Sequence, residues 1–180
     1  MKIIDNITLR EVTLGDAEKI YEAISSNREY LQIWLPFAAS LKSAEDEKVF
    51  LNSVLSIPAE ERDFVYIIEE NNSKICGIVG FHFSDFTNHR TEIGYWLLPE
   101  YQHRGIMTTC VRDLCRWAVD NRQMNRIQIR CAVGNQPSNA IPLRLGFHLE
   151  GIERDGELMI SGNYTDLNVY SILKREIEQW

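Results

Sequence analysis

The sequence predicts an α/β protein in which helices cover both faces of a mixed β-sheet. Segments that alternate or are rich in β-branched and aromatic residues are interspersed with segments of helical periodicity, in the order βααβββαβαββ. The 180 residues, 44% of them hydrophobic and 25% charged, suit one soluble globular domain. Because no repeat, linker or low-complexity segment divides the chain, we expect a single domain over residues 1–180.

The first half of the chain predicts one strand, three helical segments and a hairpin. Asp16 follows the first strand and is the expected cap of the first helix, and Pro58 ends the third helical segment. The turn Asn71-Asn72-Ser73 has the residue types of a hairpin. The expected elements are a strand at 7–12, a helix that opens at 14–16, a helical segment at 28–36, an amphipathic helix at 43–57, and strands at 64–70 and 74–83.

The second half predicts two strand-and-helix units followed by two further strands. Pro99 ends the central strand, and Gly146 is the expected C-cap of a short helix. The expected elements are a strand at 92–98, a helix from 104, a strand at 126–133, a short helix at 137–145, and strands at 148–154 and 167–173.

The turn between the central strand and the following helix has the features of an anion-binding site. The N–H groups at a helix N-terminus lack intrahelical acceptors and lie at the positive end of the helix dipole, so they attract phosphate. Gly105 lets a ligand approach the backbone closely, while His103 and Arg104 add donors. We therefore expect a phosphate-bearing ligand at this turn.

This turn and two later motifs resemble those of the GCN5-related N-acetyltransferase (GNAT) superfamily, in its RimJ/RimL-like ribosomal-protein branch. Gln102 and Gly105 match the family signature Q/R-x-x-G-x-G/A, whereas Met107 replaces the small residue of the strict pattern. Ile-Gly-Tyr-Trp-Leu precedes the signature, and Asn135-x-x-Ser138 and Arg-Leu-Gly-Phe follow it in the family order. The resemblance extends over nearly the whole chain.

The resemblance implies the GNAT acyl-CoA N-acyltransferase fold, with acetyl-CoA bound where the central strand splays from its neighbour. The pantetheine arm would pair with residues 96–98 like an added strand, and the pyrophosphate would lie on the N–H groups of residues 102–108. A backbone N–H near Leu97 or Leu98 would stabilise the oxyanion. The implied cofactor-binding residues are Trp96, Leu97, Leu98, Gln102, His103, Arg104, Gly105, Ile106, Met107, Thr108, Asn135 and Ser138.

Three residues are candidates for catalysis. In the branch that the chain resembles, a serine at the place of Ser138 protonates the leaving thiolate or donates a hydrogen bond to it; alternatively, Asn135 and Ser138 simply cap the short helix. Glu157, nineteen positions beyond Ser138, stands where similar enzymes carry a glutamate proposed to accept the amine proton through water. Glu92 is the rival base, because a half-buried carboxylate can have a raised pKa. Water alone is the remaining alternative.

The resemblance implies that the acceptor is the N-terminal amine of a ribosomal protein, and Trp34 and Phe37 are candidates to line its pocket. A polyamine, an aminoglycoside or an amino acid is the alternative acceptor, and a non-catalytic acyl-CoA sensor is the alternative to an enzyme. Residues 42–70 carry eight acids against three bases. This segment either attracts a cationic acceptor or is a solvated acidic helix, and we favour the second interpretation.

Charge and spacing argue against other ligands. The net charge of −7 disfavours broad nucleic-acid binding, and we interpret most of the arginines at 104, 112, 116, 122, 126 and 130 as a solvated flank. His82, Asp85 and His89 are spaced like metal ligands, but no further ligand follows in a matching context, so no metal is expected. No apolar run has the length of a signal peptide or a membrane span.

The cysteines predict a reducing compartment. Cys76, Cys110, Cys115 and Cys131 form no C-x-x-C pair and lie in apolar contexts, which favours buried, reduced thiols. We therefore expect a cytoplasmic enzyme. Its oligomeric state stays open, with a homodimer as one alternative.

Overall fold

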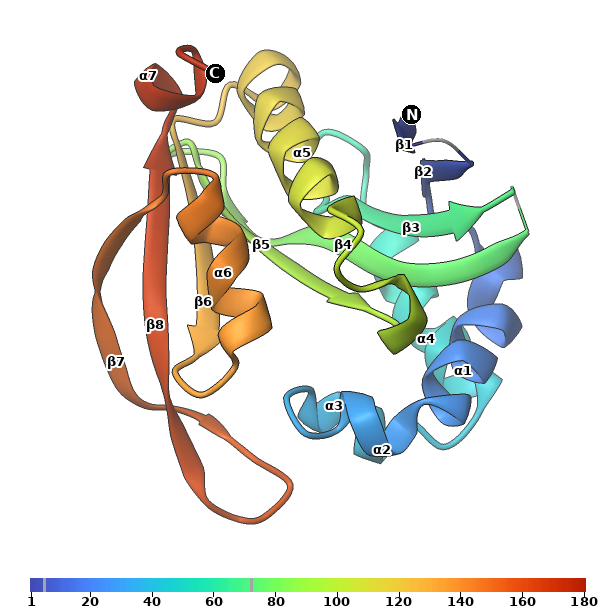
Figure 1. Ribbon diagram of the computed structural model, residues 1–180. Helices are drawn as coiled ribbons and strands as arrows, with labels where there is room; N and C mark the ends of the chain where they lie inside the picture. The colour runs from blue at the N-terminus through green and yellow to red at the C-terminus, as the bar shows by residue number, and fades with distance from the viewer. Residues whose placement is uncertain (5, 72) are drawn as a thin grey trace.

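The computed structural model describes residues 1–4, 6–71 and 73–180, which form an eight-stranded mixed sheet in the order β1-β2-β3-β4-β5-β6-β8-β7 (Figure 1). The strands are β1 (Lys2–Ile4), β2 (Ile7–Glu11), β3 (Val65–Glu70), β4 (Lys74–Asp85), β5 (Arg90–Leu97), β6 (Arg126–Ala132), β7 (His148–Leu158) and β8 (Tyr164–Leu173). The helices are α1 (Ala17–Ser26), α2 (Arg28–Leu31), α3 (Pro36–Ser40), α4 (Ala44–Leu55), α5 (Ile106–Arg122), α6 (Gln136–Arg144) and α7 (Lys174–Ile177). Two 3₁₀ turns lie at Leu14–Asp16 and Pro99–Tyr101.

The predicted element order is confirmed, with differences at the ends and in the loops. The sequence does not predict β1 or α7, and Pro36 starts a separate helix because proline favours the first helical turn. The hairpin of β7 and β8 extends into the expected loop, since Glu157 pairs with Thr165. Asn72, part of the expected turn between β3 and β4, lies outside the described residues.

The first helix begins differently from the prediction. Asp16 is at the N-cap position of α1, but its side chain makes no cap hydrogen bond to that helix. Its carboxylate instead accepts hydrogen bonds from the Thr13 N–H at 2.8 Å and from the Thr13 hydroxyl at 2.7 Å. The hydrogen-bonded Arg10, 2.7 Å away, is the main reason that the pKa of Asp16 falls to about 2. Asp16 therefore joins β2 to the turn that leads into α1.

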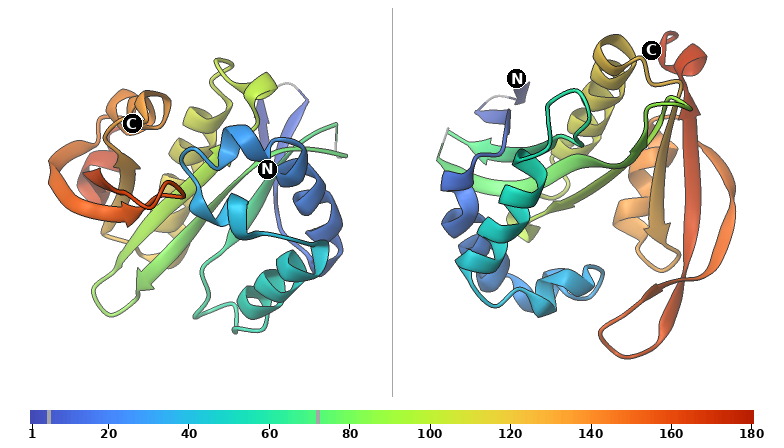
Figure 2. Two further views of the ribbon diagram at one scale, coloured as in Figure 1. Left: turned by 90° about the horizontal axis from the view of Figure 1, so that it is seen from below. Right: turned by 180° about the vertical axis from the view of Figure 1, so that it is seen from behind.

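Helices α5 and α6 cover one face of the sheet, and α1 and α4 cover the other (Figures 1 and 2). On the α5 face, Phe81 of β4 stacks on Trp117 with the ring centroids 5.8 Å apart. On the other face, α1 buries Ile20 and Ile24. All four cysteines are buried free thiols, as predicted.

β5 and β6 are parallel neighbours that separate along their length. Residues Arg90–Glu92 pair with Arg126–Gln128, whereas beyond these residues the described parts of the two strands do not pair. β5 nevertheless continues to Leu97, paired on its other side with Gly77 of β4. The sheet therefore opens between β5 and β6, which confirms the predicted splay and leaves one edge of β5 unpaired.

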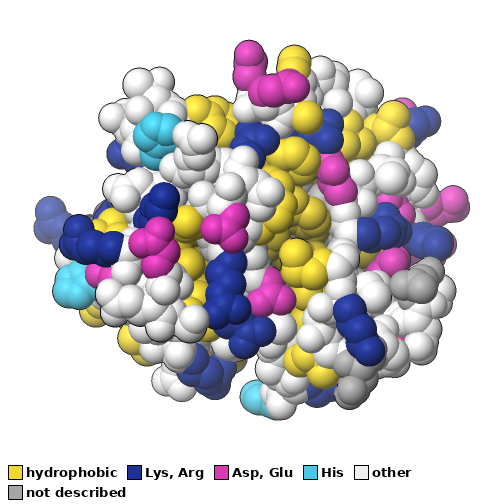
Figure 3. Space-filling model, turned by 90° about the horizontal axis from the view of Figure 1, so that it is seen from above, with side chains coloured by type: hydrophobic (Ala, Val, Ile, Leu, Met, Phe, Trp, Pro, Cys, Tyr) yellow, Lys and Arg dark blue, Asp and Glu magenta, His cyan; other side chains and the backbone are white. Residues whose placement is uncertain are grey.

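Charges of both signs mix on the molecular surface. On the face shown in Figure 3, hydrophobic side chains gather near the middle, and Lys and Arg side chains lie among Asp and Glu. Three of the arginines assigned to a solvated flank are in fact paired: Arg112 contacts Asp113 at 3.1 Å, Arg126 contacts Glu150 at 2.6 Å, and Arg130 contacts Glu92 at 2.9 Å. Across the described ranges, no helix combines the length and the apolar character that crossing a bilayer requires.

Candidate active site

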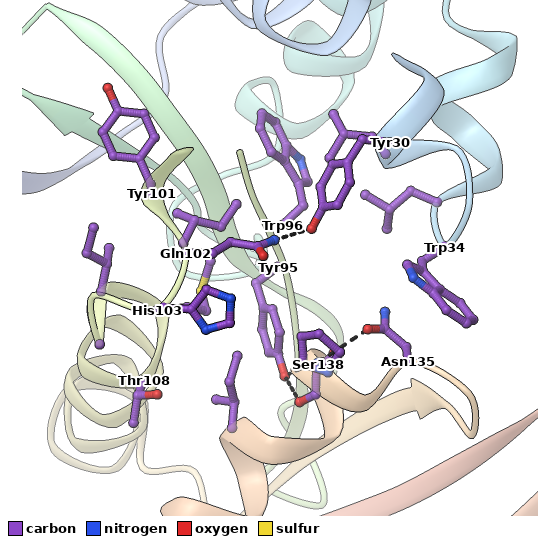
Figure 4. Close-up of a pocket in the computed structure, with 18 of the residues that line it drawn as sticks. Tyr30, Trp34, Tyr95, Trp96, Tyr101, Gln102, His103, Thr108, Asn135 and Ser138 are labelled. Atoms are coloured by element: carbon purple, nitrogen blue, oxygen red, sulfur yellow. Dashed lines mark hydrogen bonds between the residues drawn. The ribbon is translucent and has the colours of Figure 1, made fainter. Parts of the chain in front are cut away.

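A first cavity, of about 220 Å³, lies between the end of β5, the N-terminus of α5 and the start of α6 (Figure 4). Residues of α2 and the loop after it form its remaining wall. Most of the predicted cofactor residues line this cavity. They are Trp96, Leu97, Gln102, His103, Gly105, Ile106, Met107, Thr108, Asn135 and Ser138.

The N-terminus of α5 opens onto the first cavity with uncapped backbone N–H groups. Gly105 is the N-cap residue and has φ +73°, a left-handed conformation that glycine adopts without steric cost. No described side chain caps the helix, and the Thr109 N–H donates to the Gly105 carbonyl at 3.0 Å. The N–H groups of Ile106, Met107 and Thr108 precede that bond, so they have no intrahelical acceptor and can bind an anion.

The polar side chains of this turn take different directions. Gln102 donates from Nε2 to the Tyr30 hydroxyl and so joins the turn to α2 (Figure 4). Arg104 does not line the cavity: its Nη2 lies 3.8 Å from the Glu70 carboxylate, and its guanidinium lies 5.4 Å from the Tyr101 ring centroid. The predicted phosphate contact of Arg104 is thus not supported, because the acidic Glu70 and the aromatic ring attract its charge.

Leu98 also departs from the prediction. Its side chain is buried in the core, and its N–H donates to the Cys76 carbonyl on β4 at 2.8 Å. Neighbouring N–H groups of a strand point to opposite sides. Of the two expected oxyanion donors, Leu97 is therefore the one whose N–H is directed to the open edge of β5.

Ser138 lies where β5, β6 and α6 meet. Its hydroxyl donates to the Tyr95 hydroxyl at 3.3 Å and lies 3.1 Å from the Cys131 sulfur (Figure 4). Asn135 Oδ1 accepts a hydrogen bond from the Ser138 N–H at 3.3 Å and thereby caps α6. The cap is thus supplied by Asn135, and the Ser138 hydroxyl has a different set of partners.

The two neighbours of Ser138 are neutral groups. Burial raises the pKa of the Tyr95 hydroxyl well above its ordinary value, and burial also raises the pKa of the Cys131 thiol. Tyr95 donates its proton to the Ser138 carbonyl at 3.0 Å. Ser138 therefore sits in a network that is protonated at neutral pH, which suits a hydrogen-bond donor better than a nucleophile.

A second cavity, of about 850 Å³, lies on the face of the sheet that α1 and α4 cover. Gly80 of β4 and Gly94 of β5 are opposite each other in the ladder and both line this cavity, and the His82 ring occupies the space where a Cβ on Gly94 would lie. The residues shared with the first cavity are Trp34, Leu35, Tyr95, Trp96, Asn135 and Ser138. Ligands in the two cavities would therefore meet beside Tyr95 and Ser138.

Glu92 is held in a network on the wall of the second cavity. Its carboxylate contacts His82 Nε2 at 2.9 Å and accepts from Arg130 Nε at 2.9 Å and from Gln128 Nε2 at 3.0 Å. Burial raises the pKa of Glu92, but His82 and Arg130 outweigh burial and hold it below its ordinary value. This corrects the expectation of a raised pKa, and it makes Glu92 a poor proton acceptor.

Glu157 has the opposite environment. It lines the second cavity from β7, and no described residue forms an ion pair or hydrogen bond with its carboxylate. Although the residue is exposed, partial burial raises its pKa, with a further rise from Glu92 and an opposing effect of Arg130. The Glu157 carboxylate is therefore free to accept a proton.

The two predicted acceptor residues line the second cavity. Trp34 lies in the shared wall, and its Cη2 atom is 3.1 Å from the position of a Cβ built on Gly134. Phe37 of α3 is 46% exposed. Together they provide aromatic surface on the side of the cavity contributed by the N-terminal helices.

Sequence reasoning overlooks several residues that the fold brings to these cavities. Tyr95 belongs to the strand motif, and period-two alternation with Trp96 was a signal for the two faces of β5. Arg144 lines the first cavity from the last turn of α6. Tyr30 reaches the same cavity from α2, and no local pattern signals this contact, since its partner Gln102 is 72 positions away.

The three residues with metal-like spacing do not converge. His82 contacts Glu92, whereas Asp85 binds Asn88 and Arg90. Within the described ranges, no group of three or more His, Cys, Asp or Glu side chains is arranged to hold a metal ion.

Comparisons with known proteins place this site in context. Residues 6–148 match the sequence model of the family described as Acetyltransferase (GNAT) domain. The chain is 37% identical to the putative ribosomal N-acetyltransferase YdaF of Bacillus subtilis (strain 168), over 98% of this chain and 96% of that protein.

Two solved structures are similar over nearly their whole length. The microcin C7 self immunity acetyltransferase MccE, in complex with acetyl-CoA and AMP, superposes with a TM-score of 0.88 and 32% identity, covering 96% of this chain and 95% of the other. RimL, a ribosomal L7/L12 alpha-N-protein acetyltransferase in complex with coenzyme A, superposes with a TM-score of 0.88 and 26% identity, covering 96% of each chain.

Proposed function

Because the chain belongs to the GNAT acetyltransferase family, we propose that it transfers the acetyl group of acetyl-CoA directly to a primary amine in a ternary complex. The acceptor that we favour is the N-terminal amine of a ribosomal protein. One observation carries the proposal: two cavities on opposite sides of β5 share a wall that contains Ser138. A thioester in the first cavity and an amine in the second would meet at that wall.

The first cavity and the open edge of β5 suit two parts of acetyl-CoA, its pyrophosphate and its pantetheine arm. The uncapped N–H groups of Ile106, Met107 and Thr108 suit its pyrophosphate. Apart from the two adjacent residues, a Cβ built on Gly105 would meet no described protein atom within 4 Å, so space remains for phosphate there. The unpaired edge of β5 suits a pantetheine arm that binds like an added strand. MccE and RimL were solved with acetyl-CoA and coenzyme A, respectively, which supports this assignment.

Residues at the shared wall and beside it on β5 suit each step of the transfer. The amine nitrogen attacks the thioester carbon, and the Leu97 N–H stabilises the oxyanion that forms. When the C–S bond breaks, the thiolate takes a proton or a hydrogen bond from the Ser138 hydroxyl. The amine releases one proton as the amide forms, which balances the proton gained by the thiol.

Glu157 is the proton acceptor that we propose, acting through water. Its carboxylate has no partner among the described residues and has a raised pKa, whereas the oxygens of Glu92 are occupied by His82, Gln128 and Arg130. Glu92 is better suited to orient His82 and Arg130 than to accept a proton itself. Water alone remains the alternative base.

A thiol-release assay with acetyl-CoA tests the proposed function. The acceptor panel comprises peptides with Ser, Ala or Met N-termini, polyamines, aminoglycosides and amino acids. Release that is fastest with one of the peptides supports the ribosomal-protein acceptor, and release with a small amine alone replaces it. Tight acetyl-CoA binding without release on any amine would identify a sensor and contradict the proposal.

Three further expectations remain predictions: a cytoplasmic location, no binding of nucleic acid, and the choice between monomer and homodimer.

The names of the relatives support the acceptor class, because YdaF is called a putative ribosomal N-acetyltransferase and RimL an alpha-N-protein acetyltransferase.

A further inference from the structure

Helix α4 carries a carboxylate on the side that packs inward. The inward positions, at helical spacing, are Ala44, Glu47, Leu51 and Val54. Glu47 is 5% exposed and Leu51 is fully buried, whereas the outward Glu45 and Lys48 form an exposed pair at 3.7 Å. A charged residue therefore occupies a position where the helical pattern favours an apolar one.

The Glu47 carboxylate has no partner among the described residues. Burial alone perturbs it and raises its pKa to about 7, with no hydrogen bond or charge contributing. Buried charges are normally paired, because desolvating a lone carboxylate is costly. Glu47 lines the second cavity, so a ligand in that cavity can supply the missing partner.

A second acid beside the cavity is incompletely paired. Asp63 Oδ1 is buried without a hydrogen-bond partner in the described part of the chain, and Oδ2 accepts from the Ser84 N–H at 3.5 Å. Asp46 differs, since its carboxylate accepts from the N–H groups of Lys42 and Ser43 at the start of α4. Asp63 is therefore a second incompletely paired carboxylate in the wall of this cavity.

The two basic side chains that line the second cavity are already paired with acidic side chains. His82 and Arg130 both contact Glu92 at 2.9 Å, and Arg130 also contacts Glu153 at 3.2 Å. The acidic and basic side chains that line the cavity are Asp46, Glu47, Asp63, His82, Glu92, Arg130 and Glu157, and Tyr95 and Cys131 add two neutral titratable groups. The cavity wall is therefore acidic overall and favours a cationic ligand.

We propose that Glu47 binds a second, non-reacting ammonium group of the acceptor while the reacting amine lies beside Ser138. The inference rests on the proposed acetyl transfer and narrows its acceptor to molecules with at least two cationic amines. A diamine and a peptide with a lysine near its N-terminus share this chemistry. It also revises the interpretation of residues 42–70, in which Glu47 is not solvated.

The arrangement of the helices separates the two ammonium positions. α4 packs against α1 on one face of the sheet, whereas Ser138 belongs to α6 on the other face, beside the opening between β5 and β6 (Figures 1 and 2). The second cavity reaches both Glu47 and Ser138. Its volume of about 850 Å³ is in the range that encloses a whole small ligand.

Paired substrates and paired variants test the subsite. The substrates are butylamine against diaminobutane, and Ser-Ala-Ala against Ser-Lys-Ala. The protein is the full chain, the readout is kcat/KM for acetyl transfer, and calorimetry with coenzyme A present measures diaminobutane binding separately. Glu47→Gln removes the charge and keeps the shape, while Glu45→Gln on the exposed side of the same helix is the matched control.

We expect the parent to prefer the dicationic member of at least one pair by ten-fold or more. Glu47→Gln should abolish that preference and weaken diaminobutane binding, and Glu45→Gln should preserve both. The substrate pair that shows this Glu47-dependent preference tells whether the ammonium group comes from a small diamine or from a peptide lysine.

Two outcomes separate this inference from the proposed function. Acetyl transfer with no preference for dications, or with a preference that Glu47→Gln retains, overturns the subsite and leaves the transfer intact. Glu47-dependent binding of diaminobutane without acetylation of any amine would overturn the transfer and leave the subsite. If Glu47→Gln no longer binds coenzyme A, Glu47→Ala would replace it. The ratio of its kcat/KM for the dicationic substrate to its kcat/KM for the monocationic substrate would then decide in the same way.

Discussion

Ser138 and Asn135 lie three positions apart in one motif, yet their side chains have different partners. The Asn135 side chain caps α6, whereas the Ser138 hydroxyl lies between Tyr95 and Cys131 in the wall shared by the two cavities. We expect Ser138→Ala to lower kcat by roughly 10²-fold with little change in acetyl-CoA affinity, because a donor to the leaving thiolate acts mainly in the transition state. Steady-state kinetics together with calorimetry measure the two effects.

Asn135→Ala is the matched control for the cap. It should lower the free energy of unfolding by about 1 kcal/mol, the usual cost of losing an N-cap side chain. If Ser138→Ala leaves kcat unchanged, Ser138 does not assist the leaving group.

Glu157 is expected to produce the acidic limb of the pH–rate profile. Its pKa is raised, so kcat/KM should increase as the pH rises through that pKa and the carboxylate forms. For Glu157→Gln, kcat/KM should fall roughly ten- to a hundred-fold at neutral pH. It should recover partly at alkaline pH, where more of the acceptor amine is already deprotonated. The measurement is kcat/KM across the pH range for parent and variant.

The shape of the loss distinguishes the roles of Glu157. A deficit that stays constant from neutral to alkaline pH would mean that Glu157 positions the acceptor. No deficit at all would leave water as the base, since Glu92 has a lowered pKa.

At the scale of elements, the N-terminus of α5 makes a prediction with an internal control. Gly105 and Gly146 have φ of +73° and +75°, and a Cβ at either would meet no described protein atom within 4 Å apart from those of the adjacent residues. Gly105→Ala and Gly146→Ala should therefore destabilise the fold by similar amounts through backbone strain. Of the two, Gly105→Ala should also weaken acetyl-CoA binding at least ten-fold, because its methyl group would take the space proposed for phosphate. Equal affinities by calorimetry would contradict a phosphate site at this turn.

The opening between β5 and β6 explains why these elements form a site. The strands pair over three residues and then separate, so β5 has an unpaired edge in the middle of the sheet. Unpaired edges bind extended chains, and here α5 and α6 flank the edge on one face (Figure 1). Tyr95 of β5 and Ser138 of α6 line both cavities beside this opening.

At the scale of the whole molecule, the buried Glu47 should make stability depend on pH. Folding raises its pKa from 4.5 to about 7, so the folded state favours the protonated form. The contribution of protonated Glu47 to the free energy of unfolding is complete below pH 4.5 and is lost as the pH rises through about 7. The total loss is about 3 kcal/mol. Glu47→Gln should therefore be more stable than the parent near pH 8 and similar to it near pH 4.5.

Urea unfolding at these two pH values measures the effect, with Glu45→Gln as the exposed control. A stability difference between Glu47→Gln and the parent that does not grow with pH would show that the Glu47 carboxylate is solvated. Higher stability of the variant alongside weaker binding of dications would indicate a residue retained for function at a cost to the fold.

The sequence by itself determined most of the elements and the helix N-terminus at which we propose that an anion binds. Helical spacing places Met107, Cys110, Val111 and Leu114 on the buried side of α5, and Gly105 occupies the left-handed N-cap position. These features depend on residues within a few positions of one another, so local patterns are enough to predict them. The motif Asn135-x-x-Ser138 was visible for the same reason, although its two roles were not separable.

Only the tertiary structure decided which polar groups are free and which are paired. Arg130 reaches Glu92 across 38 positions and lowers its pKa, and Tyr95 reaches Ser138 across 43 positions. Arg104 turns to Glu70, while Glu47 is buried with no partner in the described residues. Charge and burial depend on neighbours that folding brings together from distant parts of the chain, and no local pattern records those neighbours.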